Sequence, residues 1–338
     1  MAILRFSLKI ILCIVFLILS SIVLLSMMHE SLGKFSNKFI SSAPLGTDDV
    51  FVRYMGNTNL LFSDGDTNLL IDGWFTRPSL VELTFGLIEP DMSAIDQAFE
   101  RGSIDNIAAV IPLHSHFDHA MDSPEVALRT GAQLLGSMST ANIGRGWGLS
   151  EEQIEVIEPN KQYRLGRFQV TLIPSKHFEF PNSSVAEALL EEIEITKPLV
   201  PPVKAADYKM GGAFTVYIQH PSGNIVVQGS AGFIPNALDE LEADVVFLGI
   251  GGLSSQTESY RKAYWQHTVR AVGPSKVYPI HWDSLTDSLE EKPVMPNLIF
   301  SKLLKFSSTS SLDHAFSSSE ADGVDIGLLP MWKNVGLF

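Results

Sequence analysis

The stretch that decides the fold is His114-Ser115-His116-Phe117-Asp118-His119, which follows the apolar run Ile107-Ala108-Ala109-Val110-Ile111. That run has the length and composition of a fully buried strand, so the stretch is predicted to form the loop at the carboxyl end of this strand. Imidazoles and a carboxylate at this density are donors suited to zinc and related divalent ions. The sequence therefore predicts a metal site on a loop held by a rigid strand.

The spacing of the four donors does not fit one face of a helix. It requires extended or irregular backbone, in which His114 and His116 project to one side while Asp118 and His119 can reach a second centre. The structural alternative is a set of solvated loop histidines. We disfavour it because neighbouring neutral histidines beside a carboxylate favour a shared cation.

Composition limits the classes of function. The chain has 338 residues, 45% of them hydrophobic, and 24 basic against 38 acidic residues give a formal net charge of -14. This charge opposes a broad phosphate-binding surface, so nucleic acid is not an expected partner. Cys13 is the only cysteine, so a metal in the rest of the chain must be held by His, Asp or Glu.

The amino-terminal segment predicts a membrane anchor. From Ile10 to Met28 there is no charge, and Arg5 and Lys9 precede this run; a helix of that length would rise about 28 Å, close to the hydrocarbon thickness of a bilayer. The alternative, a cleaved signal peptide, lacks a good cleavage site near residue 28. We predict a signal anchor over residues 1–29, a linker over 30–44 and a folded domain over 45–338, outside the cytoplasm on the periplasmic or cell-surface side.

Beyond residue 45, short β-like runs alternate with helical patterns, which indicates a mixed α/β fold with central sheets. Strands are expected at Val50–Met55, Asn59–Phe62, Leu69–Ile71, Ile107–Ile111, Val170–Ile173, Ala213–Ile218, Ile225–Val227, Val245–Leu248 and Val277–Ile280, and helices at Pro124–Thr130, Ala186–Ile193 and Thr257–Val272.

The H-x-H-x-D-H pattern resembles the signature loop of the metallo-β-lactamase fold, and the resemblance extends over most of the chain after the apolar segment. Four further stretches are similar to the branch containing ascorbate phosphate lactonases and the phospholipases D that act on N-acyl phosphatidylethanolamine: Tyr54–Thr58, Leu70–Phe75, Pro174–His177 and Pro279–Trp282. The resemblance implies an αββα sandwich, here preceded by one transmembrane helix.

Carried over by motif, the resemblance implies two metal positions. The first would be held by His114, His116 and His177. The second would be held by Asp118, His119 and His281. One departure concerns the position where the family usually has a bridging aspartate: here Ser230 occupies it. A neutral hydroxyl is a poor bridge between cations, so Ser230 is at most a weak ligand and one or two ions remain open.

These residues predict a metal-dependent hydrolase. Metal-bound hydroxide would attack an ester, lactone or phosphodiester of a small-molecule or lipid-like substrate. Asp118 would serve catalysis by ligating the second metal and orienting the water. Asp72 and Asp283 follow predicted strands and would orient ligating histidines, with a turn or helix-capping role as the alternative.

Zinc is the expected ion, with manganese or iron as alternatives. Three other functions stay open at this point: a metal- or ligand-binding protein of the same fold that lost catalysis with Ser230, a membrane-associated structural protein, and an iron-dependent redox enzyme. The sequence does not give the oligomeric state.

Overall fold

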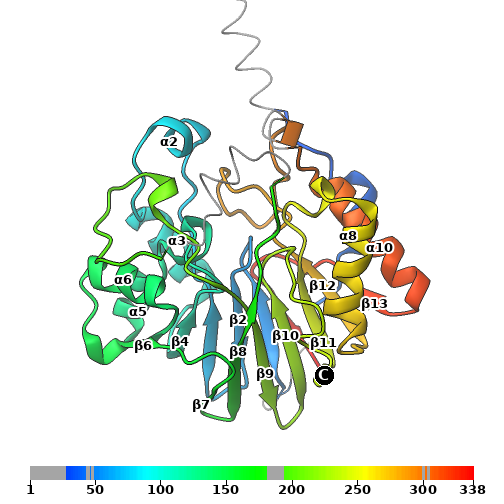
Figure 1. Cartoon of the computed structure of the whole chain (residues 1–338), viewed down its shortest axis with the longest axis horizontal. Helices are drawn as coiled ribbons and strands as arrows, with labels where there is room; N and C mark the ends of the chain where they lie inside the picture. The colour runs from blue at the N-terminus through cyan, green and yellow to red at the C-terminus, as the bar shows by residue number, and fades with distance from the viewer. Residues whose placement is uncertain (1–27, 43–45, 47–48, 181–193, 299–300, 303–304) are drawn as a thin grey trace, which may run out of the picture.

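A computed structural model describes residues 28–42, 46, 49–180, 194–298, 301–302 and 305–338. Within these residues, two seven-stranded sheets pack face to face, and helices cover both outer faces (Figure 1). This is the αββα arrangement expected from the sequence.

The first sheet has the strand order β14-β1-β2-β3-β4-β5-β6. Strand β14 and the first three strands pair antiparallel, whereas β3 to β6 are parallel. The bounds are β1 Phe51–Tyr54, β2 Leu60–Ser63, β3 Asn68–Ile71, β4 Ile107–Ile111, β5 Gln133–Gly136, β6 Ile154–Val156 and β14 Asn334–Gly336. The helices on this side are α2 Leu80–Phe85, α3 Met92–Gly102, α4 Phe117–Ala120, α5 Ser123–Thr130 and α6 Met138–Trp147, with the 3-10 turn η2 Glu151–Gln153.

The second sheet has the order β13-β12-β11-β10-β9-β8-β7, antiparallel from β7 to β10 and parallel from β10 to β13. Its strands are β7 Gln162–Leu165, β8 Phe168–Ser175, β9 Ala213–His220, β10 Gly223–Gln228, β11 Val245–Gly249, β12 Lys276–Ile280 and β13 Asp325–Ile326. Helices α8 Glu258–Trp265 and α10 Ser308–Asp322 cover its outer face, and short turns lie at η1 Gly33–Lys38, η3 Ala205–Asp207 and η4 Leu253–Ser255.

The core lies between the sheets, where the rings of Phe62 and Phe247 meet edge to face with centroids 5.2 Å apart. Strand β4 is nearly all buried because both of its faces are covered, as its continuous apolar sequence predicts. The strands β3, β4, β8, β10, β11 and β12 all end at the same edge of the sandwich. This edge brings the segments that follow them together.

The structure confirms the expected strands, with small differences at their ends, and adds elements that the sequence did not predict, among them β5, β6, α3, α6 and α10. The helix expected over Thr257–Val272 is α8 followed by a π-helical turn, η5 Gln266–Arg270. The helix expected at Ala186–Ile193 lies outside the described residues.

The expected membrane anchor also lies outside the described residues, apart from its last positions. Across the described ranges, no helix is long and apolar enough to cross a membrane. Part of the segment expected to be a linker instead packs on the domain. Phe35 of η1 is buried, and its ring stacks on that of Phe316 of α10 with centroids 5.5 Å apart. Glu30 accepts a hydrogen bond from the Thr309 backbone N–H at 2.8 Å. Residues 29–40 therefore pack on the domain, because Phe35 is an apolar anchor and Glu30 caps α10.

Candidate metal centre

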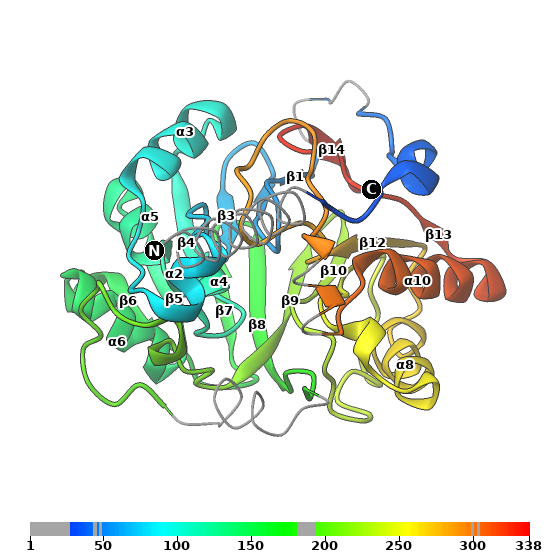
Figure 2. The ribbon, with the colours of Figure 1, turned by 90° about the horizontal axis from the view of Figure 1, so that it is seen from above.

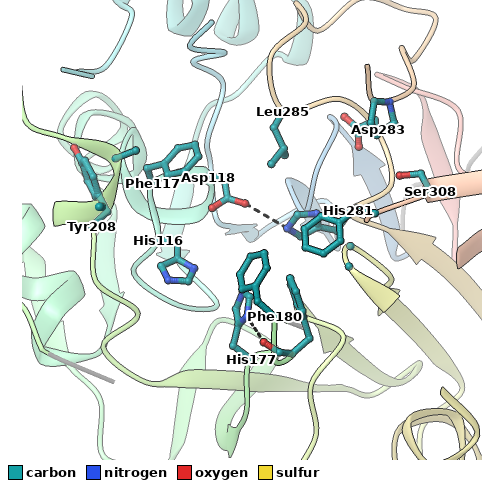
Figure 3. Close-up of a pocket in the computed structure, with 17 residues that line it drawn as sticks. His116, Phe117, Asp118, His177, Phe180, Tyr208, His281, Asp283, Leu285 and Ser308 are labelled. Atoms are coloured by element: carbon teal, nitrogen blue, oxygen red, sulfur yellow. Dashed lines mark hydrogen bonds and ion pairs between the residues drawn. The ribbon is translucent and has the colours of Figure 1, made fainter. Parts of the chain in front are cut away.

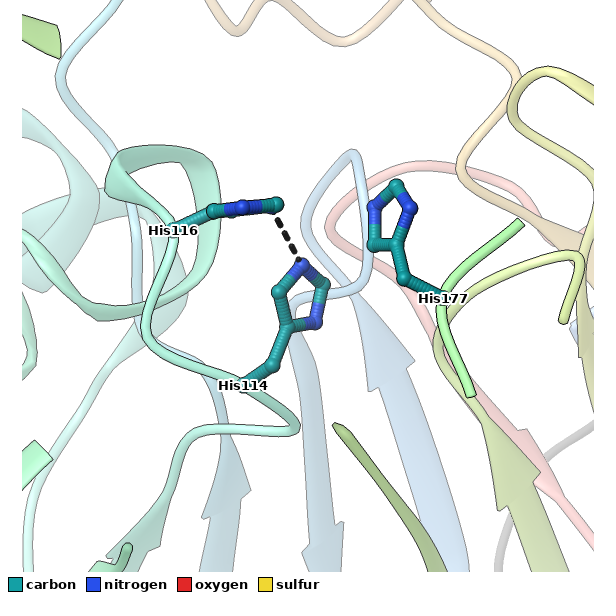
Figure 4. Close-up of side chains that lie close together, drawn as sticks. All are labelled: His114, His116 and His177. Carbon is teal, nitrogen blue, oxygen red and sulfur yellow. Dashed lines mark hydrogen bonds between the residues drawn. The ribbon is translucent and has the colours of Figure 1, made fainter. Parts of the chain in front are cut away.

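The loop after β4 places His114 and His116 side by side (Figure 4). His114 Nε2 lies 3.0 Å from His116 Nδ1. A backbone hydrogen bond fixes the loop, because the Ser115 N–H donates to the Met210 carbonyl at 3.0 Å. His116 then caps the one-turn helix α4, which carries Asp118 and His119. The short spacing between the donors thus follows from a loop that turns directly into a helix.

His177 follows the end of β8 and completes the first group. Its ring lies 5.1 Å from His114 and 5.0 Å from His116, centroid to centroid. The Nδ1–H of His177 donates to the Phe178 carbonyl at 3.0 Å, which leaves Nε2 as the ligand atom. One ligand atom from each of the three histidines lies within 4.8 Å of the others. Such a group could hold a metal ion.

Asp118, His119 and His281 form the second group, again with ligand atoms within 4.8 Å of one another. Asp118 Oδ2 lies 3.3 Å from His281 Nε2 (Figure 3). It also lies 3.6 Å from His119 Nε2. His281 follows β12 in the left-handed backbone region, with φ at 59°. Its ring passes so close to Gly251 that a Cβ there would lie 2.6 Å from its Nδ1. The neighbouring turn therefore requires a glycine.

Asp72, at the end of β3, fixes the orientation of His119. Its Oδ2 accepts a hydrogen bond from His119 Nδ1 at 2.7 Å and one from the Thr58 hydroxyl, and its Oδ1 accepts from the Leu113 N–H at 2.8 Å. All of these groups are buried. His119 Nε2 is buried too and makes no hydrogen bond within the described part of the chain. A metal at this position would satisfy an otherwise costly buried nitrogen, so the donor set fits the ion.

Asp283 acts on the backbone rather than on a histidine ring. It accepts hydrogen bonds from the Tyr54 hydroxyl at 2.7 Å and from the Asn57 N–H at 2.8 Å. The Asn57 amide donates to the Asp118 carbonyl at 2.6 Å, and the Asn57 carbonyl accepts from the His281 N–H at 2.8 Å. Asp283 thereby holds the loop that joins two residues of the second group. Asn57 lies three residues after β1, in the stretch Tyr54–Thr58 that resembles the family branch, but no role of its own could be predicted for it from the sequence.

Burial and mutual repulsion favour the neutral forms of His114 and His177. Burial lowers the pKa of His114 well below its usual value, and the neighbouring His119 and His116 lower it further. Burial and His116 likewise lower the pKa of His177. At Asp118, burial raises the pKa, but His119 and His281 outweigh it and hold the pKa of this carboxyl well below its usual range. Neutral imidazoles and an ionised carboxylate are the forms that ligate metals.

Ser230 lies next to His177 rather than among the residues that line the pocket. Its hydroxyl accepts a hydrogen bond from the Phe178 N–H at 3.2 Å. The Gln228 amide donates to the Ser230 carbonyl at 2.9 Å. Ser230 is thus engaged with the backbone that carries His177, and it adds no charge to the site.

A pocket of about 950 Å³, including its mouth, opens over both groups (Figure 3). Its wall is mostly apolar. Several of the lining residues come from the segment between His177 and β9, whose contacts could not be predicted from the sequence. The apolar lining residues are Phe117, Phe178, Phe180, Ala205, Ala206, Tyr208, Gly251, Gly252, Leu285, Pro296 and Phe306. Phe178 and Phe180, which follow His177 closely in the sequence, both belong to this apolar wall, and this role was not predicted.

Residues 67–282 match the beta-lactamase superfamily domain, which is more than half of the chain, and the chain therefore belongs to this family. A comparison with curated proteins finds no match. The pattern around His114 led to the same family from sequence alone.

Solved structures share the fold at low sequence identity. A protein described as a possible metal-dependent hydrolase from Veillonella parvula has 12% identity and a TM-score of 0.51, over 86% of this chain and 99% of that one. Igni18, a metallo hydrolase from Ignicoccus hospitalis, has 16% identity and a TM-score of 0.50, over 85% and 97%. CmlA, a diiron β-hydroxylase from Streptomyces venezuelae, has 13% identity and a TM-score of 0.50, over 87% of this chain and 55% of that one. The fold therefore occurs in proteins described as hydrolases and in one described as a hydroxylase.

Proposed function

We propose that the chain is a metal-dependent hydrolase of esters, lactones or phosphodiesters. The observation that carries the proposal is the presence of two donor groups at the base of one pocket. In each group, the ligand atoms lie within 4.8 Å of one another. His114, His116 and His177 would hold one ion, and Asp118, His119 and His281 a second. Five imidazoles and one carboxylate favour zinc, with manganese and iron as alternatives.

A divalent ion bound there would supply an activated water and stabilise negative charge that develops on the substrate. The chain's own residues do the rest. Asp118 is ionised, belongs to the second group and would orient the attacking water through a carboxylate oxygen. Asp72 keeps His119 in the tautomer that ligates. The aromatic wall excludes bulk water from the reacting centre.

The proposal extends to the branch and to the location of the protein. The stretches Pro174–His177 and Pro279–Trp282, whose histidines lie in the two groups, support the branch of lactonases and phospholipases D. The uncharged run from Ile10 to Met28 supports a membrane anchor, with the domain on the periplasmic or cell-surface side.

A second function is favoured by one observation. Ser230 brings no carboxylate, and its hydroxyl is engaged by the Phe178 N–H. If the second group binds its ion weakly for this reason, the protein would bind metal or a ligand without hydrolysing it.

The test is hydrolysis by the full-length protein after chelation and after reconstitution with zinc, manganese or iron. Nitrophenyl esters, aromatic lactones and bis-nitrophenyl phosphate serve as substrates. We expect activity on at least one class that disappears on chelation, returns with metal and falls by 100-fold or more in His116→Ala. Stoichiometric metal without turnover of any class would favour the second function.

A further inference from the structure

Above the donor groups, the wall of the pocket is mostly apolar. Its polar side chains are those of three histidines, Asp118, Asp283, Tyr208 and Ser308, and the rest of the lining is aromatic or aliphatic. The rings of Phe178, Phe180 and Phe306 contact one another, with centroids 4.8 to 5.4 Å apart. Across the described residues, no lysine or arginine lines the pocket. The upper wall therefore offers no charged partner to a substrate, and an alkyl chain would replace water on this apolar surface.

The rim of this pocket is tied to the residues that follow the uncharged run. The Leu298 N–H donates to the Met28 carbonyl at 2.8 Å, and the Glu30 N–H donates to the Pro296 carbonyl at 3.0 Å. Pro296 itself lines the pocket. Glu30 also accepts a hydrogen bond from the N–H of Ser308, a second lining residue. The run from Ile10 to Met28 therefore ends at the mouth of the pocket and not at a distant point of the domain.

Helix α2 adds an apolar surface at the same end of the molecule (Figures 1 and 2). Its inner residue Leu83 packs in a cluster that includes the lining residues Tyr208 and Leu285. Its outer residues are unusually exposed for their type, at 69% for Val81 and 86% for Phe85. The single charged residue of α2, Glu82, is engaged in a capping box with Ser79. Leu87, just after the helix, is exposed as well.

We propose that this end of the domain lies on a lipid bilayer, and that the pocket takes the acyl chain of a membrane-resident ester. This inference rests on the proposed function for the reaction and on the proposed anchor for the tether. The bilayer is the occupant because the uncharged run ends at Met28, two residues before Glu30, whose N–H donates to the carbonyl of the lining residue Pro296. With a net charge of -14, the protein favours neutral over anionic lipid.

The first experiment measures the depth of α2 in the full-length protein in phosphatidylcholine nanodiscs. Cys13→Ser removes the only cysteine, and Phe85→Cys then takes a fluorescent label. The matched control is Phe338→Cys, which replaces an exposed phenylalanine, 47% accessible, at the opposite end beside the β9–β10 turn (Figure 1).

Lipids with a nitroxide on the acyl chain should quench the label at position 85 at least threefold more than the label at 338. Equal quenching at both positions would overturn the bilayer contact. Quenching at 85 that instead depends on the number of protein copies per disc would assign this surface to a second copy of the chain, which also overturns it.

The second experiment tests the acyl chain without requiring turnover. A pyrene-labelled alkyl ether has no hydrolysable bond and serves as the binding probe. Leu285→Gln places an amide in the pocket wall, and Leu128→Gln is the control on an exposed leucine of α5. We expect affinity to fall tenfold or more in Leu285→Gln alone, with the thermal midpoint retained. Unchanged affinity, or no binding to the unaltered protein, would overturn the acyl-chain assignment, while a failure of hydrolysis with both results intact would fault only the proposed reaction.

Discussion

Asp72→Asn removes a charge behind His119 while keeping the shape of the side chain. The Leu113 N–H needs an acceptor at 2.8 Å, so the amide oxygen of the asparagine would face Leu113. The amide NH2 would then face His119 Nδ1, which now donates to the carboxylate at 2.7 Å. Two donors would oppose each other. The imidazole would escape by moving its proton to Nε2, the atom that we assign to the metal.

The cost follows from the bond that is lost. A hydrogen bond to a charged group contributes about 1.5–3 kcal/mol, and loss of such a partner of a ligating histidine lowers metal affinity by roughly 10- to 100-fold. We expect this loss at the group of Asp118, His119 and His281. The group of His114, His116 and His177 should keep its affinity.

The assay is a competitive titration of the metal-free protein with a chromophoric zinc chelator, which separates two binding constants. Asp64→Asn is the control, because Asp64 is an equally buried carboxylate that bonds Arg167 and the turn before β3. It should lower stability without changing either constant. If Asp72→Asn binds metal with the same two constants as the unaltered protein, the affinity of the second group does not depend on the orientation of His119 by Asp72.

Three further results are expected. Because burial lowers the pKa of His114 and His177, protons compete with metal at the first group only at lower pH than for exposed histidines. In the same titration, the affinity of this group should be constant from about pH 8 to pH 6 and fall below that, and half-loss at or above about 6.5 would contradict this. Gly251→Ala puts a Cβ 2.6 Å from His281 Nδ1 and should lower the affinity of the second group for metal in the same titration. An unchanged affinity would show that the turn relaxes and would contradict this prediction. Arg77→Met removes a guanidinium whose pKa burial lowers to about 10 and which donates to the Trp74 and Thr76 carbonyls; urea unfolding should show a loss of about 3 kcal/mol, and a loss under about 1 kcal/mol would refute a charge-balancing role near Asp122 and Asp283.

The strands around the site were predictable because their sequences carry a continuous or alternating apolar pattern. Strand β4 has five apolar residues in a row and is confirmed at Ile107–Ile111. Helix α10 was missed since its sequence, rich in serine, has no clear apolar period, and the helix depends on packing against Phe35 and on capping by Glu30. The packed segment at residues 29–40 was missed for the same reason: its partners lie more than 250 residues away.

The candidate site was predictable where neighbours in sequence are neighbours in space. His114 to His119 lie on one loop, and the later histidines were placed only through the resemblance to a family. Asn57 and Thr58 lie in the stretch Tyr54–Thr58 that resembles the family branch, but their roles were not predicted, because these depend on which strand ends meet. The apolar wall was missed because a phenylalanine in the core and one facing a pocket look alike in sequence.

The most direct test of the central claim is the metal content of the full-length protein, measured per chain by elemental mass spectrometry beside His116→Ala and Ser230→Asp. We predict at least one equivalent of a divalent metal in the unaltered chain, a clear loss in His116→Ala and a gain in Ser230→Asp, which introduces the carboxylate that the family usually has at this position. A folded chain that takes up no metal after reconstitution, or that holds the same amount without the His116 ring, would contradict the account.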